Sequence, residues 1–119
     1  MKGKEGAFTK QMISLVIPVY NEEDTLPALM ERIRPVMSEL ERPYEIILVD
    51  DGSRDRSLEI MTGFAESPGV RVVELTRNYG QHAAILAGFS IVRGEIVVTL
   101  DADLQNPPEE IPRLINTME

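Results

Sequence analysis

The sequence lacks cysteine and contains a single histidine. Without cysteine, disulfide scaffolds, thiolate metal sites and cysteine nucleophiles are all excluded. The histidine, His82, lies near the start of a predicted helix, where a histidine is more often structural or exposed than catalytic. Long apolar runs are also missing, because no run approaches the roughly 20 residues of a membrane span. Residues 1–11 have no signal-peptide core either, so we expect the chain as presented to be cytoplasmic.

Several common phosphate and nucleophile motifs are absent as well. No Gly-x-Gly-x-x-Gly or Walker loop occurs, which argues against a dinucleotide oxidoreductase or a P-loop NTPase. No Gly-x-Ser-x-Gly elbow of the α/β-hydrolases occurs. The net charge of −8 argues against nucleic acid as a partner, because a polyphosphate needs a cationic surface. The acid surplus is compatible with simple solubility, or with carboxylates that bind a divalent cation facing a phosphate.

The 119 residues, 43% of them apolar, fit one globular domain. Short apolar runs alternate with stretches of helical spacing, and nearly continuous apolar runs are typical of strands covered on both faces. This alternation predicts a doubly wound α/β fold with a mainly parallel sheet and helices on both faces. We expect a flexible tail at 1–13 and one domain at 14–119. The predicted strands are 14–19, 45–50, 70–75 and 95–100.

The first predicted helix carries an apolar stripe from Leu26 to Leu40, and Asp24 or Thr25 can cap it. Pro35 should bend this helix or end it early, because an interior proline removes a hydrogen bond. A later helix is expected over 81–92, with Leu86 on its apolar side.

Polar clusters follow the predicted strands, at the sheet edge where open parallel sheets bind ligands. The clusters are 20–23, 50–53, 76–80 and 101–103. Asp101 and Asp103 form the sharpest one, and both can reach one Mg²⁺ or Mn²⁺ only if the chain turns at Ala102. Gln105 offers a further oxygen ligand. The alternative is that both aspartates merely cap the next turn, but their place after a buried strand, facing Asp50, favours a metal site.

Each of the other polar clusters is compatible with a structural role and with a ligand-binding role. Asp50 and Asp51 can end a strand and cap the next helix, or a spare carboxylate can accept hydrogen bonds from a base or a ribose. Tyr20 can stack on a base while Glu22 accepts hydrogen bonds, or the segment can simply lead into a capped helix. Arg77 can meet a phosphate or be an ordinary solvated arginine.

The segments VIPVYNE (16–22), VDDGS (49–53) and DADLQ (101–105), in this order, resemble the inverting family-2 glycosyltransferases of GT-A fold. The resemblance covers residues 14–119. RNYGQH (77–82) and DADLQNPPEEIP (101–112) are similar to the polyprenyl-phosphate branch, which includes dolichyl-phosphate mannose synthases and bacterial undecaprenyl-phosphate transferases that serve lipid A modification.

The resemblance implies roles for individual positions. The nucleotide-binding residues would be Pro18, Tyr20, Glu22, Asp50, Asp51 and Ala102. Asp101 and Asp103 would be catalytic, and together with Gln105 they would hold Mg²⁺ or Mn²⁺ on the donor diphosphate. The implied donor is a nucleotide-diphosphate sugar, UDP-linked in preference to GDP-linked, and the implied acceptor is a polyprenyl phosphate.

The resemblance also implies that the acceptor-binding part lies outside this chain. We therefore expect the fragment to bind nucleotide and metal, to transfer sugar weakly or not at all, and to self-associate through uncovered apolar surface. The whole protein is expected at the cytoplasmic face of the inner membrane. Alternatives are a non-catalytic nucleotide-binding or interaction module and a nucleotidyltransferase, although the segment 17–21 lacks the phosphate loop of the latter.

Overall fold

The computed structural model describes residues 11–118. The predicted flexible tail falls largely on residues 1–10, which lie outside the described residues. Its predicted boundary at residue 13 is too late, because Ile13 is fully buried as the first residue of strand β1 (Ile13–Val19). The ordered domain therefore includes Ile13.

A 4-stranded sheet of order β3-β2-β1-β4 forms the centre of the described chain, and all its pairings are parallel. β1 lies in the middle, where Val16 is opposite both Ile47 and Thr99. Pro18, which lacks a backbone donor, lies near the end of β1 and beyond its pairing with β4, as its chemistry requires. The other strands are β2 (Tyr44–Asp50), β3 (Val70–Glu74) and β4 (Ile96–Thr99).

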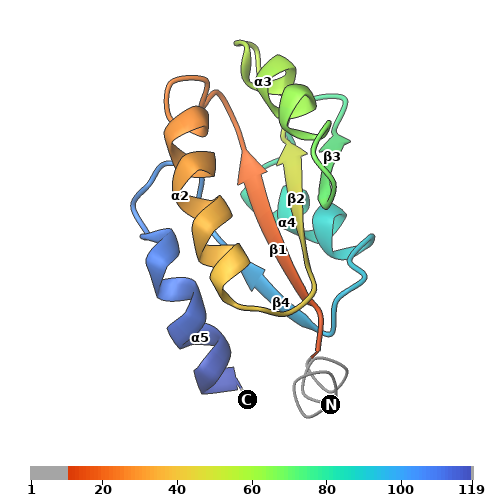
Figure 1. Cartoon of the computed structure of the whole chain (residues 1–119). Helices are drawn as coiled ribbons and strands as arrows, with labels where there is room; N and C mark the ends of the chain where they lie inside the picture. The colour runs from red at the N-terminus through yellow and green to blue at the C-terminus, as the bar shows by residue number, and fades with distance from the viewer. Residues whose placement is uncertain (1–10, 119) are drawn as a thin grey trace.

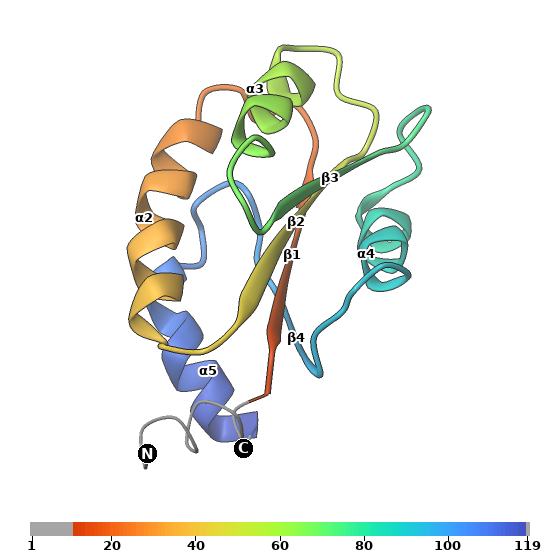
Figure 2. The same cartoon turned by 45° about the vertical axis from the view of Figure 1, so that its right-hand side comes forward.

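Helices cover both faces of the sheet, which confirms the predicted doubly wound layout (Figures 1 and 2). One face carries α2 (Leu26–Glu39), α3 (Ser57–Phe64) and α5 (Ile111–Met118), the last preceded by the short 3-10 helix η1 (Pro108–Glu110). Figure 2 shows α4 (Gln81–Phe89) alone on the opposite face.

The strands bury side chains on both faces because helices cover both. Ile13, Leu15 and Ile17 belong to the larger core under α2, and Val16 belongs to the smaller core under α4. Gly88 allows α4 to approach the sheet closely, since a Cβ there would lie 2.5 Å from Cγ1 of Val16. The apolar runs of the sequence are thus explained by two cores.

Two details of the helices differ from expectation. α2 continues through Pro35 to Glu39, so the predicted early end is wrong; the stripe from Leu26 to Met37 is buried along its whole length and stabilises the helix. α4 ends at Phe89 instead of residue 92, and Leu86 is 65% exposed. The face of α4 that meets the sheet is built from small residues, Ala84 and Gly88.

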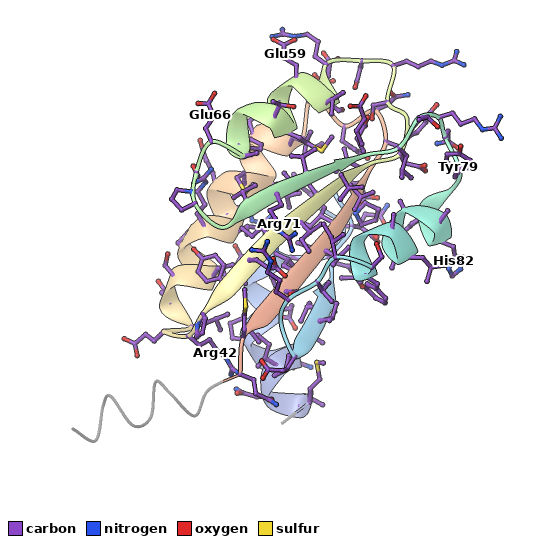
Figure 3. All side chains as sticks on the ribbon, turned by 90° about the vertical axis from the view of Figure 1, so that its right-hand side faces the viewer. Arg42, Glu59, Glu66, Arg71, Tyr79 and His82 are labelled. Atoms are coloured by element: carbon purple, nitrogen blue, oxygen red, sulfur yellow. The ribbon has the colours of Figure 1, made fainter. Side chains whose placement is uncertain are left out.

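A buried polar network lies at the amino ends of the strands, on the edge opposite the predicted site. Glu45 accepts hydrogen bonds from Ser14 Oγ (2.6 Å), the backbone N–H of Arg93 (2.7 Å) and the Arg71 guanidinium (2.7 Å). Arg71 also donates to the carbonyl of Ile91 at 2.6 Å, and Figure 3 shows it lying across the sheet. The network therefore ties the α4–β4 connection to three strands.

Burial of the Glu45 carboxyl would raise its pKa, but the hydrogen bonds from Ser14, Arg93 and Arg71 outweigh this and lower the pKa below its ordinary value. A carboxyl with a lowered folded-state pKa stabilises the protein above its unfolded pKa. That stabilisation is lost as the pH falls through the folded-state pKa.

The first prediction concerns this network. Glu45→Gln should lower the free energy of unfolding by about 3 kcal/mol at pH 7, because it removes a buried carboxylate and leaves the half-buried guanidinium of Arg71 without its counter-charge. Urea denaturation followed by circular dichroism measures the change. The matched control is Glu110→Gln, which removes an exposed i,i+3 partner of Arg113 and should have little effect.

The same variant tests the pH dependence. Wild-type stability should fall between pH 7 and pH 3, and Glu45→Gln should lose less over that interval because it lacks the titrating carboxyl. Parallel pH profiles for the two proteins would contradict the role assigned to Glu45.

The second prediction concerns association. Leu86 and Phe89 on α4, and Leu114 and Met118 on α5, are exposed large apolar side chains. Since contiguous apolar surface promotes association, the chain should sediment as a concentration-dependent mixture in analytical ultracentrifugation. A clean monomer at high concentration would contradict self-association, which remains a prediction.

Candidate functional site

The carboxyl ends of the strands meet at a cleft of about 440 Å³. The cleft lies where the order of the strands reverses, because β2 and β3 follow on one side of β1 and β4 lies on its other side. β1 and β4 are neighbours, and the loops after both lead to helices on one face, α2 and α5, whereas the loop after β3 leads to α4 on the opposite face. The cleft lies between these diverging loops. The residues lining it are Pro18, Val19, Tyr20, Glu22, Asp51, Asn78, Gly80, Gln81, Asp101, Ala102, Asp103 and Gln105.

Asp101 and Asp103 both line the cleft, because the chain turns directly after β4. Asp103 Oδ1 accepts a hydrogen bond from the backbone N–H of Gln105 at 3.1 Å, which closes the turn. The turn includes Ala102 and Asp103, as expected, and continues through Leu104, whose φ is positive (66°). Ala102 is 4% exposed and lines the cleft.

The adjacent acids Asp50 and Asp51 have different surroundings. Asp50 is buried, accepts the N–H of Ser53 at 3.1 Å and does not line the cleft. Asp51 does line it, and its carboxylate accepts the N–H groups of Tyr79 (2.8 Å) and Gly80 (3.1 Å). Asp51, not Asp50, is therefore the acid that shares the cleft with Asp101.

Glu22 lies where the first and last loops meet. Thr25 Oγ1 is 2.8 Å from Glu22 Oε1 and 3.0 Å from the carbonyl oxygen of Ala102. Thr25 stands at the N-cap position of α2, as expected, but its hydroxyl forms no side-chain cap hydrogen bond. The hydroxyl lies instead between the two loops and fixes one wall of the cleft.

Reciprocal hydrogen bonds join the loops after β1 and β2. The N–H groups of Asn21 and Glu22 donate to the hydroxyls of Ser53 and Ser57, at 2.9 and 2.8 Å. Asp55 accepts the N–H of Glu23 at 3.2 Å. Burial would raise the pKa of Asp55, but hydrogen bonds from Ser57 and Glu23 lower it below its ordinary value. These bonds set the position of Tyr20 and Glu22.

Three further residues that the sequence analysis considered are Tyr20, Arg77 and His82. Tyr20, 43% exposed, lines the cleft with Pro18 and Gln105, so a planar group can reach its ring. Arg77 lies over the ring of Tyr79, its guanidinium carbon 5.0 Å from the centroid. His82 is exposed on α4 and points away from the sheet (Figure 3).

The cleft fits a hard divalent cation that also meets a substrate. Asp101, Asp103 and Gln105 present carboxylate and amide oxygens, the donors that suit Mg²⁺ and Mn²⁺. Within residues 11–118 no group of three or more acidic or histidine side chains is close enough to bind a metal on its own. This is compatible with Mg²⁺, which commonly takes one or two carboxylates and completes its shell with water and phosphate.

Sequence reasoning assigned no individual role to three residues that line the cleft beside the start of α4. Asn78 and Gly80 belong to the expected polar cluster at 76–80, whereas Gln81 was missed. Gln81 donates from Nε2 to Asp101 Oδ1 at 2.9 Å. The only sequence signal for these residues is their position after β3, at the carboxyl edge of the sheet. Residue 81 is predicted from the sequence only as the first residue of a helix.

The parallel sheet, its order and the acidic turn at the switch point define a GT-A, Rossmann-like glycosyltransferase fold. Solved structures agree: the glucosyl-3-phosphoglycerate synthase of Mycobacterium tuberculosis, in complex with Mn²⁺, UDP and phosphoglyceric acid, matches with a TM-score of 0.74 and 30% identity. That match covers 96% of this chain and 41% of the synthase.

The chain belongs to glycosyl transferase family 2, whose sequence profile matches residues 14–119. It is 62% identical over 109 residues to the undecaprenyl-phosphate 4-deoxy-4-formamido-L-arabinose transferase of Serratia proteamaculans, covering 90% of this chain and 33% of the relative. The transferase of the same name from Pseudomonas aeruginosa LESB58 is 63% identical over 106 residues, covering 87% and 31%. The chain thus spans about one third of the curated relatives it matches, and the family argues against a nucleotidyltransferase.

The third prediction concerns the packing of the loops around Gly52. Gly52 has a φ of 76°, and a Cβ there would lie 2.4 Å from both the carbonyl carbon of Arg77 and the nitrogen of Asn78. Gly52→Ala should therefore destabilise the chain by about 2 to 4 kcal/mol, through backbone strain and the clash. Thermal and urea unfolding measure it.

Gly63→Ala is the matched control, because nothing lies within 4 Å of a Cβ at Gly63 in α3. This change should be neutral or stabilise by up to about 1 kcal/mol. Equal stability of the two variants would contradict the close approach of the loops at Gly52.

Proposed function

We propose that this chain is the donor-binding part of a glycosyltransferase that moves a sugar from a UDP-linked donor to a polyprenyl phosphate, with inversion at the sugar. The observation that carries the proposal is the cleft itself. Tyr20 and Glu22 from the loop after β1, Asp51 from the loop after β2, and Asp101 and Asp103 from the loop after β4 line one cavity. A base-stacking ring, hydrogen-bond acceptors and cation ligands are thereby combined in one place.

The nucleoside would occupy the side of the cleft near Tyr20. Its ring is accessible for stacking, and the carboxylates of Glu22 and Asp51 can accept hydrogen bonds from base or ribose. Asp50 contributes indirectly under this proposal, because it fixes the turn that carries Asp51 and Ser53. UDP is favoured over GDP by the solved relative at 30% identity that holds UDP.

The diphosphate would lie against Asp101, Asp103 and Gln105. Bound to these residues, Mg²⁺ or Mn²⁺ would act as a Lewis acid that neutralises the charge developing on the departing nucleoside diphosphate. The Mn²⁺ in the same solved relative supports a divalent cation here. Asp101 and Asp103 are the acids that we assign to catalysis, through their hold on the cation and the diphosphate.

The acceptor proposal comes from the named relatives, which are undecaprenyl-phosphate transferases at 62% and 63% identity. In the proposed step, an oxygen of the lipid phosphate bonds to the anomeric carbon while the bond from that carbon to the diphosphate oxygen breaks. UDP leaves with the electron pair, and one in-line displacement inverts the centre. A phosphate is already ionised at neutral pH, so a strong general base is less necessary than for a hydroxyl acceptor.

The lipid acceptor would bring the whole protein to the cytoplasmic face of the inner membrane, in the service of lipid A modification and the cell envelope. Among residues 11–118 no helix has the length and apolarity needed to cross a membrane. We assign efficient transfer to a protein of the relatives' full length and weak or no transfer to this chain, because this chain covers only 33% of the Serratia proteamaculans relative.

The fourth prediction tests the donor site. Calorimetric titration of UDP and of GDP into the chain with Mn²⁺ should show UDP binding more tightly, and EDTA should remove most of that binding. Asp103→Ala should abolish the Mn²⁺-dependent binding, because it deletes a carboxylate facing the diphosphate.

Asp24→Ala is the matched control, since Asp24 is an exposed aspartate outside the cleft lining. It should bind UDP like the wild type. A folded chain that binds neither nucleotide in the presence of Mn²⁺ would contradict the donor-site proposal. Tighter binding of GDP would overturn the UDP preference alone.

A further inference from the structure

We infer that Gln81 is a positioning residue for Asp101, an inference that rests on the proposed function. Gln81 is the first residue of α4, whereas Asp101 follows β4. Both line the cleft, and Gln81 Nε2 donates to Asp101 Oδ1 at 2.9 Å. The hydrogen bond therefore joins the start of α4 to the loop that follows β4.

Gln81 extends from a backbone position that is itself fixed. The preceding Gly80 donates its N–H to the carboxylate of Asp51 at 3.1 Å, and Tyr79 does so at 2.8 Å. Asp51 is only 3% exposed. The start of α4 is thereby attached to the loop after β2, and the reach of the Gln81 side chain is set relative to the rest of the cleft.

Asp101 needs such a partner because little else orients it. Its second oxygen, Oδ2, has only a long contact of 3.4 Å with Nδ2 of Asn106, an exposed residue. Thr25 fixes the neighbouring carbonyl of Ala102, but that contact leaves the Asp101 side chain free to rotate. The bond from Gln81 is the shorter of the two contacts to the carboxylate, so it contributes more to the orientation of the Asp101 side chain.

The chemistry of a carboxamide suits this task. Gln81 is a neutral donor, so it orients the carboxylate without cancelling the negative charge that attracts a cation, as a lysine or arginine would. Outer-shell partners of this kind hold ligand carboxylates in place, and their loss typically weakens metal affinity by about 10- to 100-fold. Gln81 should thus act on the nucleotide only through the cation.

The test measures UDP affinity by calorimetry at a series of Mn²⁺ concentrations, for wild type, Gln81→Met and His82→Ala. Methionine keeps the length of the side chain but cannot donate a hydrogen bond. For Gln81→Met, the Mn²⁺ concentration giving half-maximal UDP binding should rise by about tenfold or more. At saturating Mn²⁺ its UDP affinity should return to within about twofold of wild type, because excess metal compensates for a poorly oriented ligand.

His82→Ala changes the next, exposed residue of α4 and should leave both values unchanged. The melting temperature of Gln81→Met should also match wild type, since Gln81 is exposed. A wild-type Mn²⁺ dependence in Gln81→Met would overturn the inference while leaving the proposed function intact.

A loss of UDP affinity that excess Mn²⁺ does not restore would also overturn it, because Gln81 would then contact the nucleotide directly. A wild-type chain that binds UDP without any Mn²⁺ dependence would overturn both the inference and the metal-assisted function. The failures of the two proposals are therefore distinguishable.

Discussion

The handedness of the crossovers between parallel strands is the constraint on which the rest of this structure depends. A right-handed connection from β1 to β2 places α2 on one face of the sheet. The connection from β3 passes beyond β1 to reach β4 on the other side, so the same handedness places α4 on the opposite face. The loop that leads into α4 therefore diverges from the loops after β1 and β4, and the cleft lies between them.

Buried carboxylates then determine how rigid each edge of the sheet is. At the amino edge, Glu45 is surrounded by donors from Ser14, Arg71 and the backbone, and it fixes the α4–β4 connection. At the carboxyl edge, Asp51 performs the same physical task for the start of α4, with the backbone N–H groups of Tyr79 and Gly80 as donors. Hydrogen bonds to buried carboxylates therefore hold the chain at both ends of α4.

The cleft combines this rigid frame with acids that remain accessible. Asp101 and Asp103 are more exposed than Asp51, and they lie on a turn that follows an edge strand of only four residues. Their geometry depends on contacts from other elements, namely Thr25 at the start of α2 and Gln81 at the start of α4. The acidic turn is therefore supported from both helical layers of the molecule.

The sequence by itself determined the class of fold and most of the cleft. Apolar runs alternating with helical stretches predicted a doubly wound parallel sheet, and polar residues after each run predicted a site at the carboxyl edge. These predictions depend on periodicity and on chain order, both of which are local properties. Residues such as Tyr20, Glu22, Asp101 and Asp103 were found because they sit at strand ends.

Only the tertiary structure decided how neighbouring polar residues divide their tasks. Asp50 and Asp51 are the same amino acid at adjacent positions, so the sequence cannot tell them apart. Asp50 is directed into the loop interior and Asp51 into the cleft, because successive residues of an extended chain point to opposite sides. From the sequence alone, Thr25 is expected to cap a helix and Gln81 to begin one. Their partners, Ala102 and Asp101, are separated from them by 77 and 20 residues, and no local pattern encodes a hydrogen bond across such a distance.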